Sequence, residues 1–148
     1  MVLSDKNTKI IFPTSITLLN WLAGVSSIIL SANGMFIEAT LLILIAGFLD
    51  FFDGLVARTV DAVSDFGKEL DSFSDSVSFG LAPSFLMYFY FQQFGVFDSI
   101  LEFSAFIPAS GVILRLARFN SSQSGSSDFY GLASPGSALL IIGWFFAF

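Results

Sequence analysis

The sequence contains no cysteine and no histidine among its 148 residues. Disulfide bonds, thiolate nucleophiles, cysteine-bound metals and imidazole bases are therefore excluded. Charged residues are also scarce, at 12% of the chain against about 25% in a typical soluble domain. Any acid–base chemistry must use the few Asp, Glu, Lys and Arg side chains, or Tyr, Ser and Thr.

Apolar residues are abundant, at 55% of the chain, and Phe alone occurs 20 times. A soluble core of this size could not bury so much apolar surface, so the composition indicates a polytopic membrane protein. Five stretches are long and apolar enough to span a bilayer, which predicts an all-α transmembrane bundle. They are 11–30, 35–56, 65–91, 99–116 and 131–148. The predicted connections include a turn centred near Asp61 and a Ser- and Gly-rich loop at 120–131.

All six basic residues fall on one side of this arrangement. They are Lys6, Lys9, Arg58, Lys68, Arg115 and Arg118. Because Lys and Arg concentrate in cytoplasmic loops, this placement predicts a multi-pass protein with its N-terminus on the cytoplasmic side. The turn between the second and third spans faces the same side.

The charge pattern around that turn is unusual for a membrane segment. Asp50 and Asp53 lie three residues apart in the second span, and Asp71 and Asp75 lie four apart in the third. Residues at these separations share one face of a helix. An antiparallel hairpin would bring all four carboxylates to a similar depth, roughly 10–20 Å from the tip of the turn.

Four carboxylates at one depth repel each other, and burial penalises each charge further. Two divalent cations would balance four negative charges, and all-oxygen sites suit hard cations such as Mg²⁺ or Mn²⁺. Paired metals of this kind support displacement at phosphorus. A cation carrier or channel that uses the carboxylates as an ion site is the non-enzymatic alternative.

The spacing around the carboxylates resembles the full signature of the CDP-alcohol phosphotransferase family. The matching positions are Asp50, Asp53, Gly54, Ala57, Arg58, Gly67, Asp71 and Asp75. This resemblance implies a membrane enzyme in which a hydroxyl attacks a CDP-linked lipid or alcohol and expels CMP. It also implies two bound divalent cations, six transmembrane helices and a homodimer.

The resemblance also implies a role for each matching residue. Asp50, Asp53 and Asp71 would be metal ligands, and Asp75 would be a further ligand or the base that takes the hydroxyl proton. The CDP site would be lined by Asp50, Gly54, Ala57, Arg58 and Gly67. The small residues among them would let a phosphate approach the backbone, although tight helix packing also explains small residues in membranes. The absence of histidine argues against the unrelated phospholipase-D-like serine phosphatidyltransferases, which need histidine nucleophiles.

Further segments resemble the phosphatidylserine synthase branch of this family. They are "SDSVSFGLAPSFLMY" at 74–88, "RLARFN" at 115–120, "FYGLASPGSALL" at 129–140 and "FPTSITLLNWLAG" at 12–24. The resemblance implies CDP-diacylglycerol and L-serine as substrates, with phosphatidylserine and CMP as products. Lipids with ether-linked archaeal chains are an alternative, and no nucleic-acid partner is expected.

The acceptor would need a cationic partner, because serine carries a carboxylate. Arg115 and Arg118 could bind it or could hold the lipid diphosphate. Ser78 and Asn120 could orient the amino acid. The plainer alternatives are that the arginines anchor their helix and that Ser78 packs against a neighbour.

The acceptor and the extent of the domain are the last two features that the sequence addresses. Glycerol phosphate or inositol phosphate is an alternative acceptor, although a phosphorylated alcohol should need more cationic groups than two arginines. Residues 1–148 are interpreted as one transmembrane domain that holds five spans of a six-helix family fold and lacks the last helix.

Overall fold

The computed structural model describes residues 2–60, 65–95, 99–121 and 134–147. Side chains are described for 14–52, 66–95, 100–118, 120 and 135–143. The predicted turn near Asp61 and residues 122–131 of the predicted loop lie outside these ranges.

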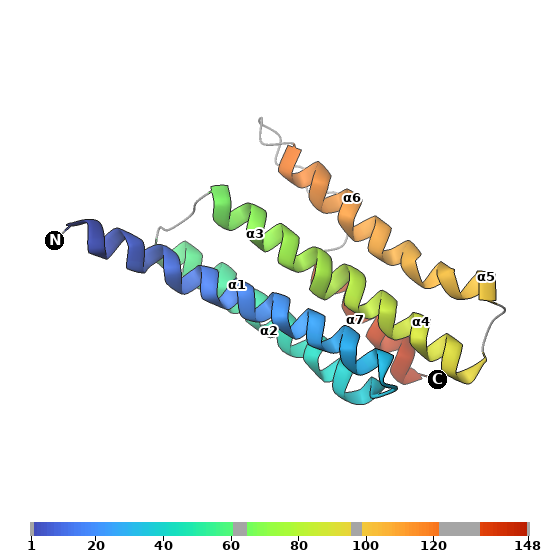
Figure 1. Cartoon of the computed structure of the whole chain (residues 1–148). Helices are drawn as coiled ribbons and strands as arrows, with labels where there is room; N and C mark the ends of the chain where they lie inside the picture. The colour runs from blue at the N-terminus through green and yellow to red at the C-terminus, as the bar shows by residue number, and fades with distance from the viewer. Residues whose placement is uncertain (1, 61–64, 96–98, 122–133, 148) are drawn as a thin grey trace.

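The described residues form five helical rods and no strand (Figure 1). The helices are α1 (Val2–Ala32), α2 (Phe36–Val60), α3 (Asp65–Asp75), α4 (Ala82–Phe94), α5 (Ser99–Glu102), α6 (Ile107–Ser121) and α7 (Ser134–Ala147). A π-helical segment, η1 (Ser76–Leu81), joins α3 to α4, and a 3-10 segment, η2 (Phe103–Phe106), joins α5 to α6. The all-α prediction is therefore confirmed for the described residues, and each predicted span corresponds to one rod.

The α1–α2 hairpin closes through a tight turn at Asn33–Met35. Gly34 has φ 75°, a left-handed conformation that glycine adopts without a steric penalty. The Met35 N–H donates to the Leu30 carbonyl at 3.0 Å, which satisfies one of the last carbonyls of α1. Across the hairpin, the Ser27 hydroxyl donates to the Ala39 carbonyl at 2.8 Å. These contacts fix the register of α1 against α2.

The interface of α1 with α3 and η1 is built from small and polar residues. The Ser74 hydroxyl donates to the Thr17 carbonyl at 3.1 Å, and the Ser78 hydroxyl donates to the Asn20 carbonyl at 3.0 Å. The residue numbers increase in the same direction on both sides of the interface, from Thr17 to Asn20 in α1 and from Ser74 to Ser78 in the facing rod. The helix α1 therefore runs parallel to α3. At Gly24, an added Cβ would lie 2.6 Å from the Ser78 Oγ and 2.8 Å from its Cα. Only glycine allows the two backbones to approach this closely.

The apolar core lies between α2, the α3–η1–α4 rod and α7. Its members are mostly small or branched, and Phe79 is the largest side chain that is fully buried. Alanines of α2, α4 and α7 keep the helices close, since interfaces between membrane helices favour small residues. This packing holds the middle of α2 against η1, directly after the acidic segment of α3.

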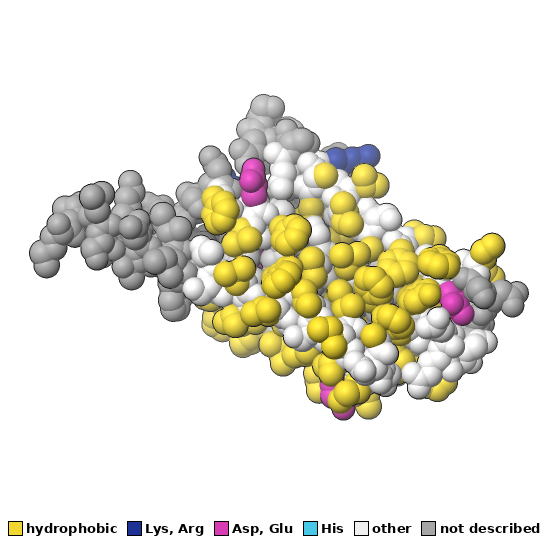
Figure 2. Space-filling view, viewed as in Figure 1, with side chains coloured by type: hydrophobic (Ala, Val, Ile, Leu, Met, Phe, Trp, Pro, Cys, Tyr) yellow, Lys and Arg dark blue, Asp and Glu magenta, His cyan; other side chains and the backbone are white. Residues whose placement is uncertain are grey.

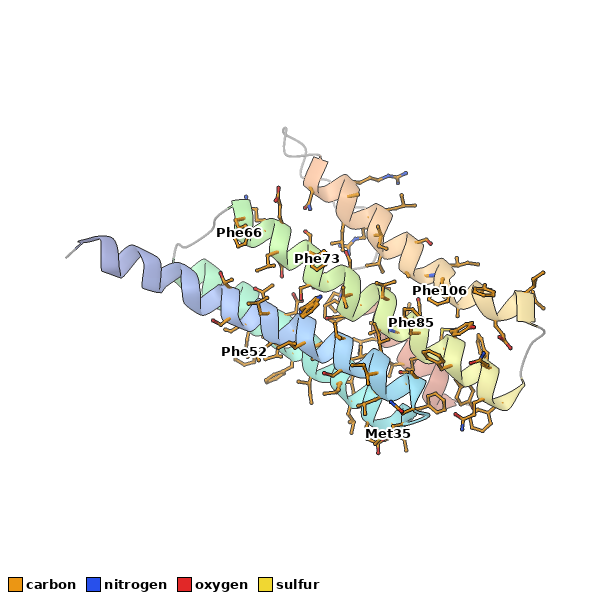
Figure 3. All side chains as sticks on the ribbon, viewed as in Figure 1. Met35, Phe52, Phe66, Phe73, Phe85 and Phe106 are labelled. Atoms are coloured by element: carbon orange, nitrogen blue, oxygen red, sulfur yellow. The ribbon has the colours of Figure 1, made fainter. Side chains whose placement is uncertain are left out.

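The outer surface is largely apolar. Figure 2 shows hydrophobic side chains over much of the described part of the visible face. Aromatic rings also meet at the surface between rods, as Phe85 and Phe106 do with ring centroids 5.0 Å apart (Figure 3). Among the described residues, Thr14–Ala32 and Ile100–Arg118 are long and apolar enough to cross a bilayer, with mean hydropathy 1.5 and 1.6. These features support a membrane protein.

Candidate active site

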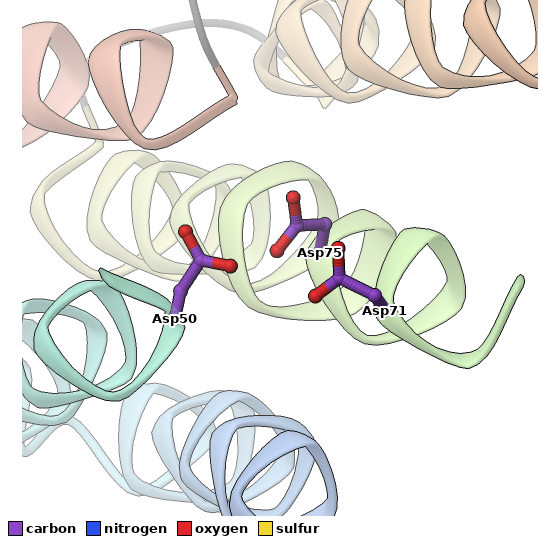
Figure 4. A group of neighbouring side chains, drawn as sticks. All are labelled: Asp50, Asp71 and Asp75. Atoms are coloured by element: carbon purple, nitrogen blue, oxygen red, sulfur yellow. The ribbon is translucent and has the colours of Figure 1, made fainter. Parts of the chain in front are cut away.

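Three carboxylates meet between α2 and α3 (Figure 4). Asp50 comes from α2, and Asp71 and Asp75 come from successive turns of α3. Each contributes one oxygen, and these three oxygens all lie within 4.8 Å of one another. The four-residue separation within α3 puts both of its carboxylates on the face turned toward α2. The spacing argument from the sequence therefore predicted this convergence correctly for three of the four aspartates.

The cluster is removed from bulk solvent to different degrees. Asp50 and Asp71 are half-buried, whereas Asp75 is 8% exposed and its Oδ1 atom is buried without a hydrogen-bond partner. An unpaired oxygen of this kind is costly, because a buried polar group without a partner loses the hydrogen bond it makes to water. A cation placed among the three carboxylates would supply the missing interaction. The donor set, made only of carboxylate oxygens, fits Mg²⁺ or Mn²⁺.

Four of the predicted site residues lie in the last turns of α2. Asp53, Gly54, Ala57 and Arg58 are helical in backbone, but their side chains lie outside the described residues. The fourth carboxylate and most of the CDP site therefore remain predictions. Gly67 is half-buried in the first turn of α3, one turn before Asp71.

The end of α6 lies beside the acidic helix. Asn120 accepts a hydrogen bond from the Ser72 hydroxyl at 3.2 Å, and Ser72 directly follows Asp71. Arg115 is half-buried and close enough to Asp75 to attract its carboxylate. Arg118 is exposed one turn further along α6. The structure thus brings the "RLARFN" segment to the carboxylates, although 40 residues of sequence separate Arg115 from Asp75.

Ser78 lies in a different environment from the other predicted acceptor residues. It is fully buried in η1, and its hydroxyl donates to the Asn20 carbonyl. Gly24 of α1 packs directly against it. This placement favours helix packing, which was the plainer of the two interpretations of Ser78.

Asn20 is a residue that the sequence reasoning did not single out. It is 1% exposed on α1, and neither its Oδ1 nor its Nδ2 has a hydrogen-bond partner. Its carbonyl contact to Ser78 and the neighbouring Thr17–Ser74 contact place it near the level of Asp75. A polar amide within an apolar helix was the available signal, since polar groups in membrane spans are costly and mark functional sites.

Comparisons with known proteins find a matching sequence family and several similar proteins. The sequence family described as CDP-alcohol phosphatidyltransferase matches residues 10–148. CDP-diacylglycerol–serine O-phosphatidyltransferase of Bacillus subtilis is 39% identical over 130 residues, which are 88% of this chain and 72% of that protein. The Helicobacter pylori (strain J99) protein of the same name is 37% identical over 139 residues, or 92% of this chain and 57% of that protein.

An archaeal relative extends the comparison. Archaetidylserine synthase of Methanothermobacter thermautotrophicus is 37% identical over 144 residues, covering 95% of this chain and 60% of that protein. The chain therefore spans between 57% and 72% of the length of these relatives. The match of nearly the whole sequence, together with the converging aspartates, shows that the chain belongs to the CDP-alcohol phosphatidyltransferase family.

Proposed function

We propose that this protein is a membrane enzyme that transfers the phosphatidyl group of CDP-diacylglycerol to the hydroxyl of L-serine. The products are phosphatidylserine and CMP. The observation that carries the proposal is the convergence of Asp50, Asp71 and Asp75 within the family's signature. The choice of serine is supported by relatives named as serine phosphatidyltransferases at 33–40% identity.

The carboxylates would hold two divalent cations, Mg²⁺ or Mn²⁺. The convergence of Asp50, Asp71 and Asp75 supports this, and Asp53 is the expected fourth ligand. When bound, the cations supply positive charge that neutralises the diphosphate and stabilises the leaving group. The unpartnered Asp75 Oδ1 and the all-carboxylate donor set fit such ions.

The residues of the chain would perform the remaining steps. Asp75 accepts the proton of the serine hydroxyl as the serine oxygen forms a bond to the phosphorus on the lipid side. The bond from that phosphorus to the oxygen bridging to CMP breaks, and CMP leaves with the electron pair. The CDP site would be lined by Gly54, Ala57, Arg58 and Gly67. The small residues among them would leave room for CDP.

The acceptor would bind between α3 and the end of α6. Arg115 is close enough to attract the Asp75 carboxylate and could pair with the serine carboxylate, while Arg118 could hold the same group or the lipid phosphate. Asn120, fixed by Ser72, lies at the same end of α6. Ser78 remains a weaker candidate because its hydroxyl is already bonded within the bundle.

The arrangement in the membrane is also part of the proposal. The basic residues would place the N-terminus and the carboxylates at the cytoplasmic face of a multi-pass transmembrane domain over residues 1–148. A homodimer and a sixth helix are expected from the family. The archaetidylserine synthase relative supports an ether-linked lipid as the alternative donor.

The test is CMP release from purified protein with CDP-diacylglycerol and a panel of alcohols. Serine should give the highest kcat/KM, and ethanolamine, which lacks the carboxylate, should be a poor acceptor. Faster release with glycerol phosphate or inositol phosphate would correct the acceptor and leave the reaction class intact. Absence of release with every alcohol, in the presence of Mg²⁺ or Mn²⁺, would overturn the proposed function.

A further inference from the structure

The buried face of α1 carries a stripe of small and polar residues. Its members follow one another at alternating separations of three and four residues, a pattern typical of a helix that packs closely against its neighbours: Thr17, Asn20, Gly24, Ser27 and Ser31. The hydroxyls of Ser27 and Ser31 donate to carbonyls at 2.8 Å. The Asn20 side chain is different, because it is 1% exposed and neither of its polar atoms has a hydrogen-bond partner. A buried polar group of this kind points to a water, ion or ligand that completes it.

Two contacts give the level of Asn20 relative to Asp75. The Thr17 carbonyl accepts a hydrogen bond from the hydroxyl of Ser74, which directly precedes Asp75. The Asn20 carbonyl accepts one from the hydroxyl of Ser78, three residues after Asp75. Asp75 therefore lies between these two contacts along the rod that faces α1. Because the Cα–Cβ bond of a helical residue tilts toward the N-terminus of its helix, the Asn20 amide leans from the level of Ser78 toward that of Asp75.

The register of the α1–α2 hairpin gives the level of Asn20 relative to Asp50. The Ser27 hydroxyl and the Ala39 carbonyl meet across the hairpin, whose two helices run antiparallel. Asn20 lies seven residues before Ser27, so it faces the level of Ala46, seven residues after Ala39. Asp50 lies four residues beyond Ala46, about 6 Å along the helix axis. The side chains of Asn20 and Asp50 lean toward each other, because each tilts toward the N-terminus of its own helix and those termini lie at opposite ends.

We propose that Asn20 is a positioning residue for the metal centre between α2 and α3. Its amide hydrogen-bonds, directly or through one buried water, to the carboxylates of Asp50 and Asp75, and so fixes which of their oxygens face the cations. This inference rests on the metal site of the proposed function and adds to that site a residue from α1. Partners behind metal ligands hold the ligands in orientation and contribute to metal affinity. An amide suits this task, since it can both donate and accept and adds no further charge to the cluster.

The experiment measures Mn²⁺ binding by the purified, substrate-free protein in detergent, using the electron paramagnetic resonance signal of unbound Mn²⁺. Asn20→Leu keeps a similar volume and removes the amide. It should raise the Kd for Mn²⁺ about 10–100-fold, the usual loss when a residue behind metal ligands is removed. Its Tm without Mn²⁺ should be native or higher, because two buried polar atoms without partners are gone. Weaker binding would then not result from poorer folding.

Asn20→Ser should reverse the relation between stability and binding. The smaller side chain leaves a cavity, so the Tm should fall. Its hydroxyl and a water admitted by the polar cavity can still donate to the carboxylates. This variant should therefore bind Mn²⁺ more tightly than Asn20→Leu although it is less stable.

Thr40→Val is the control for the loss of a buried polar group. It removes a buried hydroxyl that donates to the Phe36 carbonyl at 2.7 Å. Thr40 lies ten residues before Asp50 in α2, which is about 15 Å along the helix axis. The Kd of this variant for Mn²⁺ should be native.

The outcomes separate this inference from the function on which it rests. A native Kd in Asn20→Leu, or a Mn²⁺ affinity that follows the Tm across the two Asn20 variants, would overturn the positioning role and leave the metal site standing. Absence of Mn²⁺ binding by the unmutated protein would overturn the metal site and this inference with it. Mn²⁺ binding that depends on Asn20, in a protein that releases no CMP with any alcohol, would support this inference and overturn the proposed reaction.

Discussion

At the scale of single residues, Asp75 differs from its two neighbours in the cluster. It is the most buried of the three and carries the unpartnered oxygen. A carboxylate in this position can take a proton from a substrate hydroxyl without competition from bulk water. The proposed role of Asp75 as a base is separable from metal binding by kinetics.

Asp75→Asn should lower kcat by roughly 10²–10⁴-fold, the usual contribution of general base catalysis. Affinity for CDP-diacylglycerol should change much less, because the other aspartates remain. Steady-state kinetics and direct CDP-lipid binding would measure the two effects separately. Glu38→Gln, an exposed carboxylate in the first turn of α2, is the matched control and should be neutral. Weakened lipid binding with a native kcat would assign Asp75 to binding.

Arg115→Lys should raise the KM for serine, because lysine cannot reproduce the two-pronged contact of a guanidinium with a carboxylate. The KM for CDP-diacylglycerol should stay near the native value. The two constants are measured by varying one substrate at saturating levels of the other. The reverse pattern, a native serine KM with weaker lipid binding, would make Arg115 a clamp for the diphosphate.

Asn20→Leu should raise the stability of the substrate-free protein and lower its activity. The substitution keeps a similar volume and removes two buried polar atoms without partners, each of which costs about 1–3 kcal/mol. Activity should fall if the Asn20 amide, which is buried near the level of Asp75, contacts a water or a ligand during the reaction. Tm and CMP release report the two effects. A stabilised variant with native activity would reduce Asn20 to a packing residue.

At the scale of elements, the approach of α1 to η1 determines where the acidic helix lies. Gly24 permits this approach, and the two serine–carbonyl bonds at Ser74 and Ser78 fix its register. The π-helical segment begins directly after Asp75 and holds both Ser78 against α1 and Phe79 in the core. Segments of this kind are frequent at functional sites. The position of the carboxylates is therefore coupled to helix packing one turn away.

Gly24→Ala should destabilise the protein by about 1–3 kcal/mol, the usual cost of overpacking. The added methyl group would lie 2.8 Å from the Ser78 Cα, so the backbones themselves must separate. Gly111→Ala is the control, since nothing lies within 4 Å of the added Cβ. Thermal unfolding in detergent measures both. A Gly24→Ala protein as stable as the control would mean that α1 can shift away from η1 without loss.

At the scale of the whole molecule, the carboxylate cluster opposes folding unless its charge is balanced. Three carboxylates within 4.8 Å repel each other strongly in a partly buried setting. Cations bound to the folded state alone should stabilise it by mass action. The stability of the entire bundle should therefore depend on divalent ions.

Mn²⁺ or Mg²⁺ should raise the free energy of unfolding by about 2.7 kcal/mol at a hundred times the Kd, and a chelator should reverse the gain. Asp71→Asn should fold without metal, lose most of this gain and lose turnover. Thermal unfolding with and without ions, followed by CMP release, tests both expectations. Full activity in excess chelator, or equal stabilisation of Asp71→Asn, would contradict the metal site.

The part of the fold that could be predicted is the part governed by local spacing. Each of the five predicted spans corresponds to a helical rod, because apolar length and helical periodicity are properties of contiguous sequence. The π-helical and 3-10 segments at Ser76–Leu81 and Phe103–Phe106 were not predicted. They arise where one rod must fit several neighbours, which no local pattern encodes.

The sequence by itself determined the family, the helical class and the pairing of acidic residues on each helix. These follow from residue type and from separations of three and four along one chain. Only the tertiary structure decided which polar groups already have a hydrogen-bond partner, as at Ser78. It also decided which buried polar atoms have none, as at the side chain of Asn20 and the Oδ1 of Asp75. It also decided that α2 and α7 enclose an apolar groove beside Asp50. The reason is that hydrogen bonding and free volume depend on contacts between residues distant in sequence, and those contacts exist only once the helices have packed.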